Sequence, residues 1–242
     1  MGLWCGVRII SGRYKSKKLI SPPGDEKTRP LPDRVKLAVF NILRGHVEGE
    51  AVFDGFSGSG AIGLECASRG ASRVVMVEQD KKIAGVVRQN IEMLGASPPC
   101  ELVVGDALGS IALSRCPDPV HLVFLDPPYK LVREKAGWNS VRAQAAKLIG
   151  RLDDKGFAVI RTPWPFVHPV DVTPAPAATG VEVIDLAQIG DDELDRLDAA
   201  TGAAKPEKAD AELSIEGAVG PETHVYRHTA VHLYMRDGAA HE

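Results

Sequence analysis

Five short apolar segments alternate with segments of helical periodicity between residues 51 and 160. This alternation constrains the fold more than any other feature of the chain. Strands are expected at 51–54, 73–78, 101–104, 120–125 and 157–160, and the longer helices between them at 61–69, 81–94 and 138–151. Strands that alternate with helices of this length predict a parallel sheet that is covered by helices on both faces.

Composition places the chain among ordinary globular proteins. Of its 242 residues, 44% are apolar and 25% are charged, which is typical of one or two packed domains. No apolar run approaches the roughly 18 residues that a membrane span needs, so no membrane segment is expected. The four cysteines include no Cys-X-X-Cys pair. We therefore expect neither a disulfide framework nor a cysteine zinc site, and we predict a reducing, cytoplasmic location.

The N-terminal region is basic. Residues 1–49 carry a net charge of +6, although the whole chain carries −3. Residues 7–21 are predicted to form a β-hairpin, and Asp33 is the expected N-cap of a helix over 34–44. Five basic side chains would lie together on that hairpin: Arg8, Arg13, Lys15, Lys17 and Lys18. Basic clusters displace counterions from phosphate backbones, so this region is either a nucleic-acid-binding face or a solvated surface.

The C-terminal region differs in charge and regularity. Residues 182–222 carry a net charge of −9, and the part from about 190 to 222 is predicted to be a flexible acidic insertion. Residues 224–235 alternate in polarity and are expected to form one final strand. His224, His228 and His232 would share one face of that strand, with no nearby acid or cysteine to complete a ligand set. No metal site is therefore predicted.

A glycine-rich loop follows the first predicted strand. Gly58, Gly60 and Gly63 have GxGxxG spacing, and Glu78 ends the second strand. Glycines allow the backbone to approach a ligand before a helix begins. A carboxylate at the end of the second strand can accept hydrogen bonds from both hydroxyls of a ribose. These features fit NAD and S-adenosylmethionine equally, and an ordinary tight strand–helix turn is the alternative.

Asp106 and Ala107 follow the third predicted strand. The Asp106 carboxylate can accept a hydrogen bond from an adenine amine, and the backbone amide of Ala107 can reach the ring. The alternative is that Asp106 caps the short helix that follows. We favour the cofactor contact.

The sequence Asp126-Pro127-Pro128-Tyr129 follows the fourth strand, at the sheet edge where parallel strands place ligands. A hydride-transfer enzyme has no use for this motif, but an enzyme that methylates a planar exocyclic amine does. The lone pair of such an amine is delocalised into the ring. The Asp126 carboxylate and the Pro127 carbonyl can hold the two N–H groups and localise that lone pair for in-line attack. Tyr129 can stack on the base, so the motif favours S-adenosylmethionine over NAD.

With these motifs in place, the chain resembles the bacterial 16S rRNA methyltransferases that modify N2 of guanine 966. The resemblance covers about residues 7–160 and the last strand. It is carried by Arg8-Ile9-Ile10-Ser11-Gly12-Arg13-Tyr14-Lys15, Arg29-Pro30, Asp33-Arg34-Val35, Phe40-Asn41-Ile42-Leu43, Gly58-Ser59-Gly60-Ala61-Ile62-Gly63-Leu64-Glu65, Ser68-Arg69-Gly70-Ala71 and Asp126-Pro127-Pro128-Tyr129. The chain departs from the family at Leu31-Pro32, where threonines are usual.

The resemblance implies a class I methyltransferase with a Rossmann-like α/β fold. Its sheet would have seven mainly parallel strands with helices on both faces. Residues 1–48 would form a basic RNA-binding extension with a hairpin and a helix, and residues 49–242 the methyltransferase domain. Asp126 and Tyr129 would hold the target base, together with the Pro127 carbonyl. The implied cofactor contacts are Asp54, Gly58, Gly60, Glu78 and Asp106, with Ala107 beside Asp106.

The reaction implied is transfer of a methyl group from S-adenosylmethionine to guanine N2 in 16S rRNA or the assembling 30S subunit. We expect a monomer that needs no metal and no membrane. Methylation of adenine N6 in DNA or RNA is an alternative, because Asp-Pro-Pro-Tyr suits either exocyclic amine. A non-catalytic rRNA-binding module is the alternative from another class.

Overall fold

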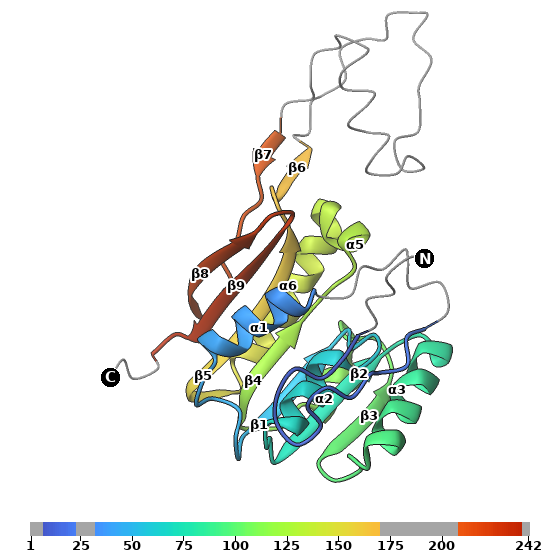
Figure 1. Ribbon diagram of the computed structural model, residues 1–242. Coiled ribbons are helices and arrows are strands. Elements are labelled where there is room, and N and C mark those ends of the chain that lie inside the picture. Colours follow the sequence, from blue (N-terminus) through green and yellow to red (C-terminus); the bar gives the residue numbers. More distant parts are fainter. Residues whose placement is uncertain (1–6, 23–31, 170–207, 239–242) are drawn as a thin grey trace, which may run out of the picture. The chain divides into compact units, whose positions relative to one another are not determined.

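The computed structural model describes residues 7–22, 32–169 and 208–238 (Figure 1). The chain divides into two compact units, one formed by Met1–Phe166 with Glu212–Glu242 and the other by Val167–Ala211. In the second unit, strand β6 (Val167–Pro169) pairs antiparallel with β7 (Lys208–Asp210). The first unit contains the main sheet and every predicted site residue.

The main sheet has seven strands in the order β3-β2-β1-β4-β5-β9-β8. Neighbours from β3 to β5 pair parallel, whereas β9 pairs antiparallel with both β5 and β8. The strands are β1 (Ala51–Gly55), β2 (Arg73–Glu78), β3 (Cys100–Val104), β4 (Val120–Leu125), β5 (Leu152–Pro163), β8 (Ala218–Tyr226) and β9 (Thr229–Arg236). The predicted α/β fold with a mainly parallel seven-stranded sheet is confirmed.

Helices cover both faces of this sheet. On one face, α1 (Asp33–Ile42), α2 (Ala61–Ser68) and α3 (Lys81–Leu94) pack their apolar residues into a core shared with the strands. Figure 1 shows α1 lying across β4 and β5, with α2 beside it. On the other face, α6 (Lys135–Ile149) packs against β4, β5 and β9, with α5 (Tyr129–Arg133) next to it. Helix α4 (Ser110–Arg115) connects β3 to β4. None of the helices in the described ranges is long and apolar enough to cross a membrane.

The prediction of one strand over 224–235 is wrong. The segment contains the end of β8 and most of β9, which form an antiparallel hairpin. The chain turns at Arg227, whose φ is +56°. Alternation of polarity continues through this turn, so the pattern did not reveal it. Of the predicted flexible insertion, residues 190–207 lie outside the described residues, whereas 208–222 include β7 and the first part of β8.

The predicted hairpin at 7–21 is present as a chain reversal rather than as two regular strands. Arg8 and Lys18 form an isolated antiparallel bridge. The reversal is fixed to α2 by the Glu65 carboxylate, which accepts the backbone N–H groups of Ile10 at 2.7 Å and Ser11 at 3.0 Å. Backbone hydrogen bonds also join the two arms, from Ile9 N to the Lys17 carbonyl at 2.9 Å and from Leu19 N to the Val7 carbonyl at 2.8 Å. The order of this extension therefore comes both from its own pairing and from a buried acid of the main domain.

Glu65 also holds two cations. The Nζ of Lys36 lies 3.7 Å from one Glu65 oxygen, and the Nε of Arg69 lies 2.8 Å from the other. Lys36 and Glu65 are both almost completely buried, and burial lowers the pKa of Lys36. Lys36 also donates to the Arg8 carbonyl at 2.6 Å. Because buried charges are costly without partners, this cluster fixes the extension against α1 and α2.

Asp33 is not the N-cap of the predicted helix. Helix α1 begins at Asp33 itself and is preceded by Pro32. The Asp33 carboxylate instead accepts from the Nε of Arg8 at 2.7 Å.

Candidate active site

Strand register brings the predicted site residues to one edge of the sheet. Gly55, the last residue of β1, is level with Leu125 at the end of β4, and Leu125 is level with Ile160 in β5. Asp126 and Arg161, the next residues of their strands, therefore lie side by side. This is the carboxyl edge, where open parallel sheets bind ligands.

Two positions of the glycine loop have a left-handed backbone conformation, which favours glycine. Gly58 and Gly60 have φ values of +55° and +81°, and Gly60 is the N-cap of α2. The Gly58 N–H donates to Glu78 at 3.0 Å, so the loop contacts the carboxylate that the sequence assigns to a ribose. Among the described residues, the buried Oγ of Ser57 has no hydrogen-bond partner. A side chain at Gly58 would meet open space, so a ligand can approach the backbone there.

Asp54 is buried under this loop, where its Oδ2 accepts the Gly63 N–H at 2.8 Å. Burial raises the pKa of Asp54 to about 7. The hydrogen bond from Gly63 opposes this shift, and the charges of Asp126 and Glu78 add to it. Burial also raises the pKa of Glu78. A cation bound beside Asp54 and Glu78 would favour the ionised forms of both carboxyl groups.

Asp106 and Ala107 follow β3, as predicted. Asp106 is exposed, and its Oδ1 accepts the Leu108 N–H at 2.9 Å. Gly109 is the residue that precedes α4, so the helix-capping alternative for Asp106 is wrong. Ala107 is buried, and its carbonyl accepts from the side-chain amide of Gln144 at 3.1 Å.

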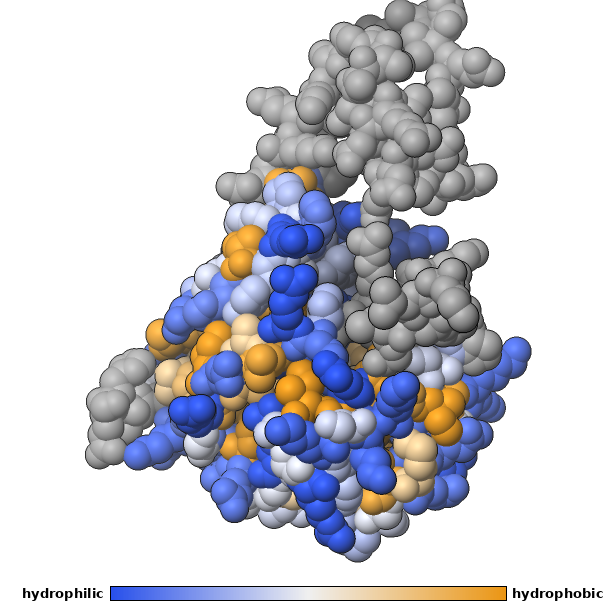
Figure 2. Space-filling view, in the orientation of Figure 1, coloured by the Kyte–Doolittle hydropathy of each residue, from blue (hydrophilic) through white to orange (hydrophobic). Residues whose placement is uncertain are grey.

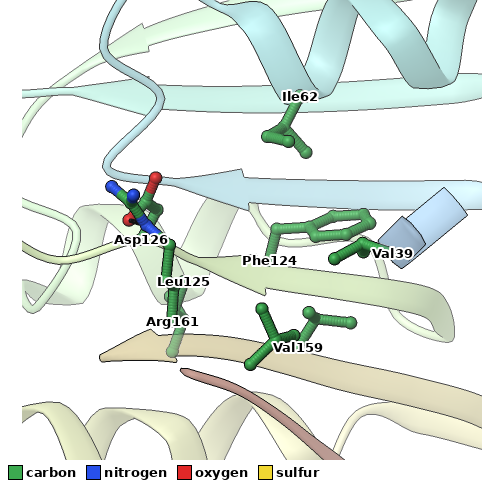
Figure 3. A pocket seen from close by; sticks show the side chains of 8 residues that line it. Val39, Ile62, Phe124, Leu125, Asp126, Val159 and Arg161 are labelled. Carbon is green, nitrogen blue, oxygen red and sulfur yellow. Dashed lines mark hydrogen bonds and ion pairs between the residues drawn. The ribbon is translucent and has the colours of Figure 1, made fainter. Parts of the chain in front are cut away.

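A narrow pocket opens beside Asp126. It is lined by Asp126, Arg161 and six apolar side chains, those of Val39, Ile62, Phe124, Leu125, Val159 and Val231. Figure 3 shows the heads of Asp126 and Arg161 together at one end, with Phe124 and Val159 toward the other. The Nε of Arg161 donates to the Oδ1 of Asp126 at 2.5 Å. The pocket is therefore apolar, with one charged and hydrogen-bonding end.

Tyr129 begins α5, and its hydroxyl donates to the Oγ1 of Thr229 at 2.7 Å. The guanidinium carbon of Arg161 lies 5.2 Å from the centroid of the Tyr129 ring. Pro127, between Asp126 and the helix, is buried. The motif is thus held at both ends by residues of β5 and β9.

The predicted RNA-binding side chains are exposed on the extension; they are Arg8, Arg13, Lys15, Lys17 and Lys18. Arg8 pairs with Asp33, and the guanidinium carbon of Arg13 lies 5.6 Å from the ring centroid of Tyr14. On the face that Figure 2 shows, hydrophilic residues interrupt the apolar ones. The extension thus offers charge to water or to a polar partner.

Sequence reasoning missed two residues of this region. Arg161 is one; its only signal is a single charge at the end of an apolar strand. Asn90 in α3 is the other. Its side chain exchanges hydrogen bonds with the backbone of Ile20, at 2.8 and 3.0 Å, and donates to the Ser59 carbonyl at 3.0 Å. Asn90 therefore joins the extension to the glycine loop.

Comparison with known proteins places this chain in a family. Residues 7–162 match the model described as Conserved hypothetical protein 95. The chain belongs to this family. Ribosomal RNA small subunit methyltransferase D of Haemophilus influenzae is 36% identical over 124 residues, which are 51% of this chain and 64% of that protein. The Escherichia coli protein of the same name is 34% identical over 126 residues, 51% of this chain and 61% of the relative. The predicted resemblance to small-subunit rRNA methyltransferases is confirmed at the level of the family.

The matched part spans a little under two thirds of these two relatives and 71% of Bacillus subtilis YlbH, which is 34% identical over 131 residues, 54% of this chain. Among solved structures, Escherichia coli yhhF has a TM-score of 0.61 at 23% identity, covering 97% of this chain and 99% of its own. TrmN from Thermus thermophilus has a TM-score of 0.56 at 19% identity, covering 88% and 52%. These likenesses support the fold.

Proposed function

We propose that the protein transfers a methyl group from S-adenosylmethionine to the N2 amine of a guanine in 16S rRNA. The observation that carries the proposal is the position of Asp126. It follows β4 at the carboxyl edge, one strand away from the glycine loop, and it forms the charged end of an apolar pocket. The names of the family relatives support small-subunit rRNA as the substrate.

The residues that follow β1, β2 and β3 fit this cofactor. Glu78 offers carboxylate oxygens to the ribose hydroxyls, and Asp106 offers its carboxylate to the adenine amine. The unpartnered Ser57 hydroxyl and the open space at Gly58 allow the loop to receive a ligand. Bound S-adenosylmethionine supplies a methyl group on a sulfonium, a cation that the carboxyl groups of Asp54 and Glu78 favour.

Asp126 acts as a hydrogen-bond acceptor for the target amine. Arg161 occupies Oδ1, so Oδ2 is the oxygen that accepts an N–H of the amine, and the Pro127 carbonyl accepts the other. These two bonds localise the nitrogen lone pair, which forms the new N–C bond as the C–S bond breaks. We assign the proton that the amine then loses to water, since a protonated Asp126 would give up its ion pair with Arg161.

The flat base would lie at the carboxyl edge beside Asp126 and Tyr129, because the apolar lining beneath Asp126 belongs to the buried core. A base inside folded rRNA must leave its stack before N2 reaches the methyl group, which costs a few kcal/mol. Stacking on the Tyr129 ring offsets part of this cost. The exposed basic side chains of the extension supply phosphate contacts around the extruded nucleotide. We propose that the protein acts on rRNA as a monomer in the cytoplasm.

The test is a tritiated-methyl transfer reaction with purified protein, using 16S rRNA and 30S particles from a bacterial strain that lacks the modification. We expect N2-methylguanosine when the product nucleoside is identified by mass spectrometry. Asp126→Ala should bind cofactor nearly as the native protein does but lose at least about 100-fold in kcat, since its interaction is made in the transition state.

Three outcomes would contradict the proposal. N6-methyladenosine as the product would identify an adenine methyltransferase of the same fold. RNA binding without methyl transfer to any rRNA or particle would identify a binding module. Equal turnover by Asp126→Ala would remove Asp126 from the mechanism.

A further inference from the structure

A second cluster of titratable side chains lies at the opposite edge of the sheet. It consists of His46, which follows α1; Glu50, which precedes β1; His121 in β4; and Asp153 in β5. His121 and Asp126 are five residues apart along one strand, so at roughly 3.3 Å per residue the cluster is about 17 Å from the active site. The proposed methyl transfer uses none of these four residues.

His121 is the centre of the cluster. Its side chain is 7% exposed, and its Nδ1 lies 2.8 Å from an Asp153 oxygen and 3.9 Å from a Glu50 oxygen. One ligand atom from each of these three residues lies within 4.8 Å of the other two. Donors bound at about 2.0–2.1 Å to a tetrahedral zinc ion are roughly 3.3 Å apart. The observed separations lie on either side of that value, so small side-chain movements would complete the set.

His46 contacts the ring nitrogen of His121 that faces away from Asp153. The Nδ1 of His46 lies 2.9 Å from the Nε2 of His121, and the two rings stack with centroids 5.2 Å apart. A histidine that binds a metal through one ring nitrogen carries its proton on the other and donates it to a neighbouring acceptor. His46 Nδ1 is placed to be that acceptor, which leaves Nδ1 of His121 available for a metal.

We propose that Glu50, His121 and Asp153 bind one divalent transition-metal ion of the zinc type, with water completing the coordination. Imidazole and carboxylate ligands suit such ions. Two carboxylates beside one buried imidazole carry a charge that a divalent cation balances. The ligands come from three separate segments, so the ion links the start of β1 to β4 and β5. Its role is therefore structural, at a distance from methyl transfer.

The test uses the full chain without an affinity tag, freed of metal by a chelator that is then removed by dialysis. Zinc chloride is titrated by calorimetry, and cobalt chloride by visible absorption. We expect one ion per chain, d–d absorption of the intensity that tetrahedral cobalt gives, and a thermal unfolding midpoint that rises with metal concentration.

Variants decide whether the named residues hold the ion. Glu50→Gln changes a side chain that is 41% exposed, so it should fold normally and weaken metal binding at least tenfold. Asp153→Asn should do the same, with its metal-free unfolding midpoint measured as a check on folding. His228→Gln is the control, because His228 is an exposed histidine outside the cluster, and it should leave binding unchanged. Absence of one-to-one binding to the native chain, or native affinity in Glu50→Gln, would overturn the proposal and leave a hydrogen-bonded His46–His121–Asp153 network.

Discussion

The guanidinium of Arg161 contacts both side chains that the Asp-Pro-Pro-Tyr motif offers to a base. Its Nε donates to Asp126 at 2.5 Å, and its carbon lies 5.2 Å from the Tyr129 ring centroid. Guanidinium donors lie in a rigid plane, so a bound carboxylate is fixed in orientation as well as in charge. Arg161 is therefore a positioning residue: it determines which oxygen of Asp126 remains to accept the target amine.

Arg161→Ala should lower kcat by about 10- to 100-fold, because a small misplacement of a group that orients the reacting atoms has an effect of that size. Cofactor binding, measured by calorimetry, should change little. Arg161→Lys keeps the charge but loses the planar fork, so it should recover only part of kcat.

Arg236→Ala is the matched control. Arg236 also pairs with an aspartate, Asp154, but at an exposed position away from the motif, and its loss should leave kcat unchanged. If Arg161→Ala turns over as the native protein does, the ion pair has no role in orienting Asp126.

The parts of the fold and site that the sequence predicted are those with a strong local pattern. Parallel strands buried on both faces are largely apolar runs. β2 contains four consecutive apolar residues, and β1 and β4 are apolar except for Asp54, Gly55 and His121. The positions of Glu78 at the end of β2 and of Asp126 just after β4 followed from the end of each apolar run. The glycine loop was found because its backbone requires positive φ at Gly58 and Gly60.

The parts that could not be predicted depend on contacts between segments distant in sequence. Glu65 looks like one polar residue on an apolar helix, yet it binds Lys36 and the backbone of Ile10. The role of Arg161 follows only from the pairing of β5 with β4, which places Arg161 beside Asp126. The hairpin of β8 and β9 was missed because its two-residue turn preserves the alternation of polarity.

Cofactor affinity should depend on pH through Asp54. Burial raises the pKa of Asp54 to about 7, so at pH 6 the carboxyl group is mostly protonated. A bound sulfonium cation favours the ionised form. Binding near pH 6.5 should therefore release protons, and affinity should increase as the pH rises through 7. Calorimetry at a series of pH values, in two buffers with different ionisation enthalpies, measures the release.

Asp54→Asn provides the comparison, because it cannot ionise. It should show a smaller proton release and a flatter dependence of affinity on pH between 6 and 8. An unchanged release in this variant would assign the titration to another group, such as Glu78.

His232 should make the fold sensitive to acid. It is fully buried in β9, between the hydroxyl groups of Thr162 at 2.8 Å and Thr223 at 2.9 Å. Burial lowers the pKa of His232 to about 4. The folded state thus binds fewer protons than the unfolded state, whose histidine has a pKa near 6.5. The resulting stability is fully present above pH 6.5 and is lost as the pH falls toward 4, by about 3 kcal/mol in total.

Urea unfolding between pH 4 and 7 tests this for the native chain and for His232→Gln, which keeps a hydrogen-bonding amide but does not titrate. The free energy of unfolding should fall less steeply with acidification in the variant. Parallel curves for the two proteins would show that another group controls acid sensitivity.

The basic extension should make the affinity for rRNA depend on salt concentration. Arg13, Lys15 and Lys17 are exposed on a chain reversal that Glu65 holds against α2. Each phosphate contact contributes roughly 0.7–0.9 to the slope of log binding constant against log salt. Changing all three residues to alanine should therefore weaken rRNA binding and lower that slope by about two. Cofactor binding should remain native, because these three side chains are exposed on the extension and the glycine loop is held by Glu78 and Asn90. Lys147→Ala, an exposed lysine on α6, is the control and should not alter the slope. If the triple variant keeps both the affinity and the salt slope of the native protein, the extension serves only solubility and RNA binds another surface.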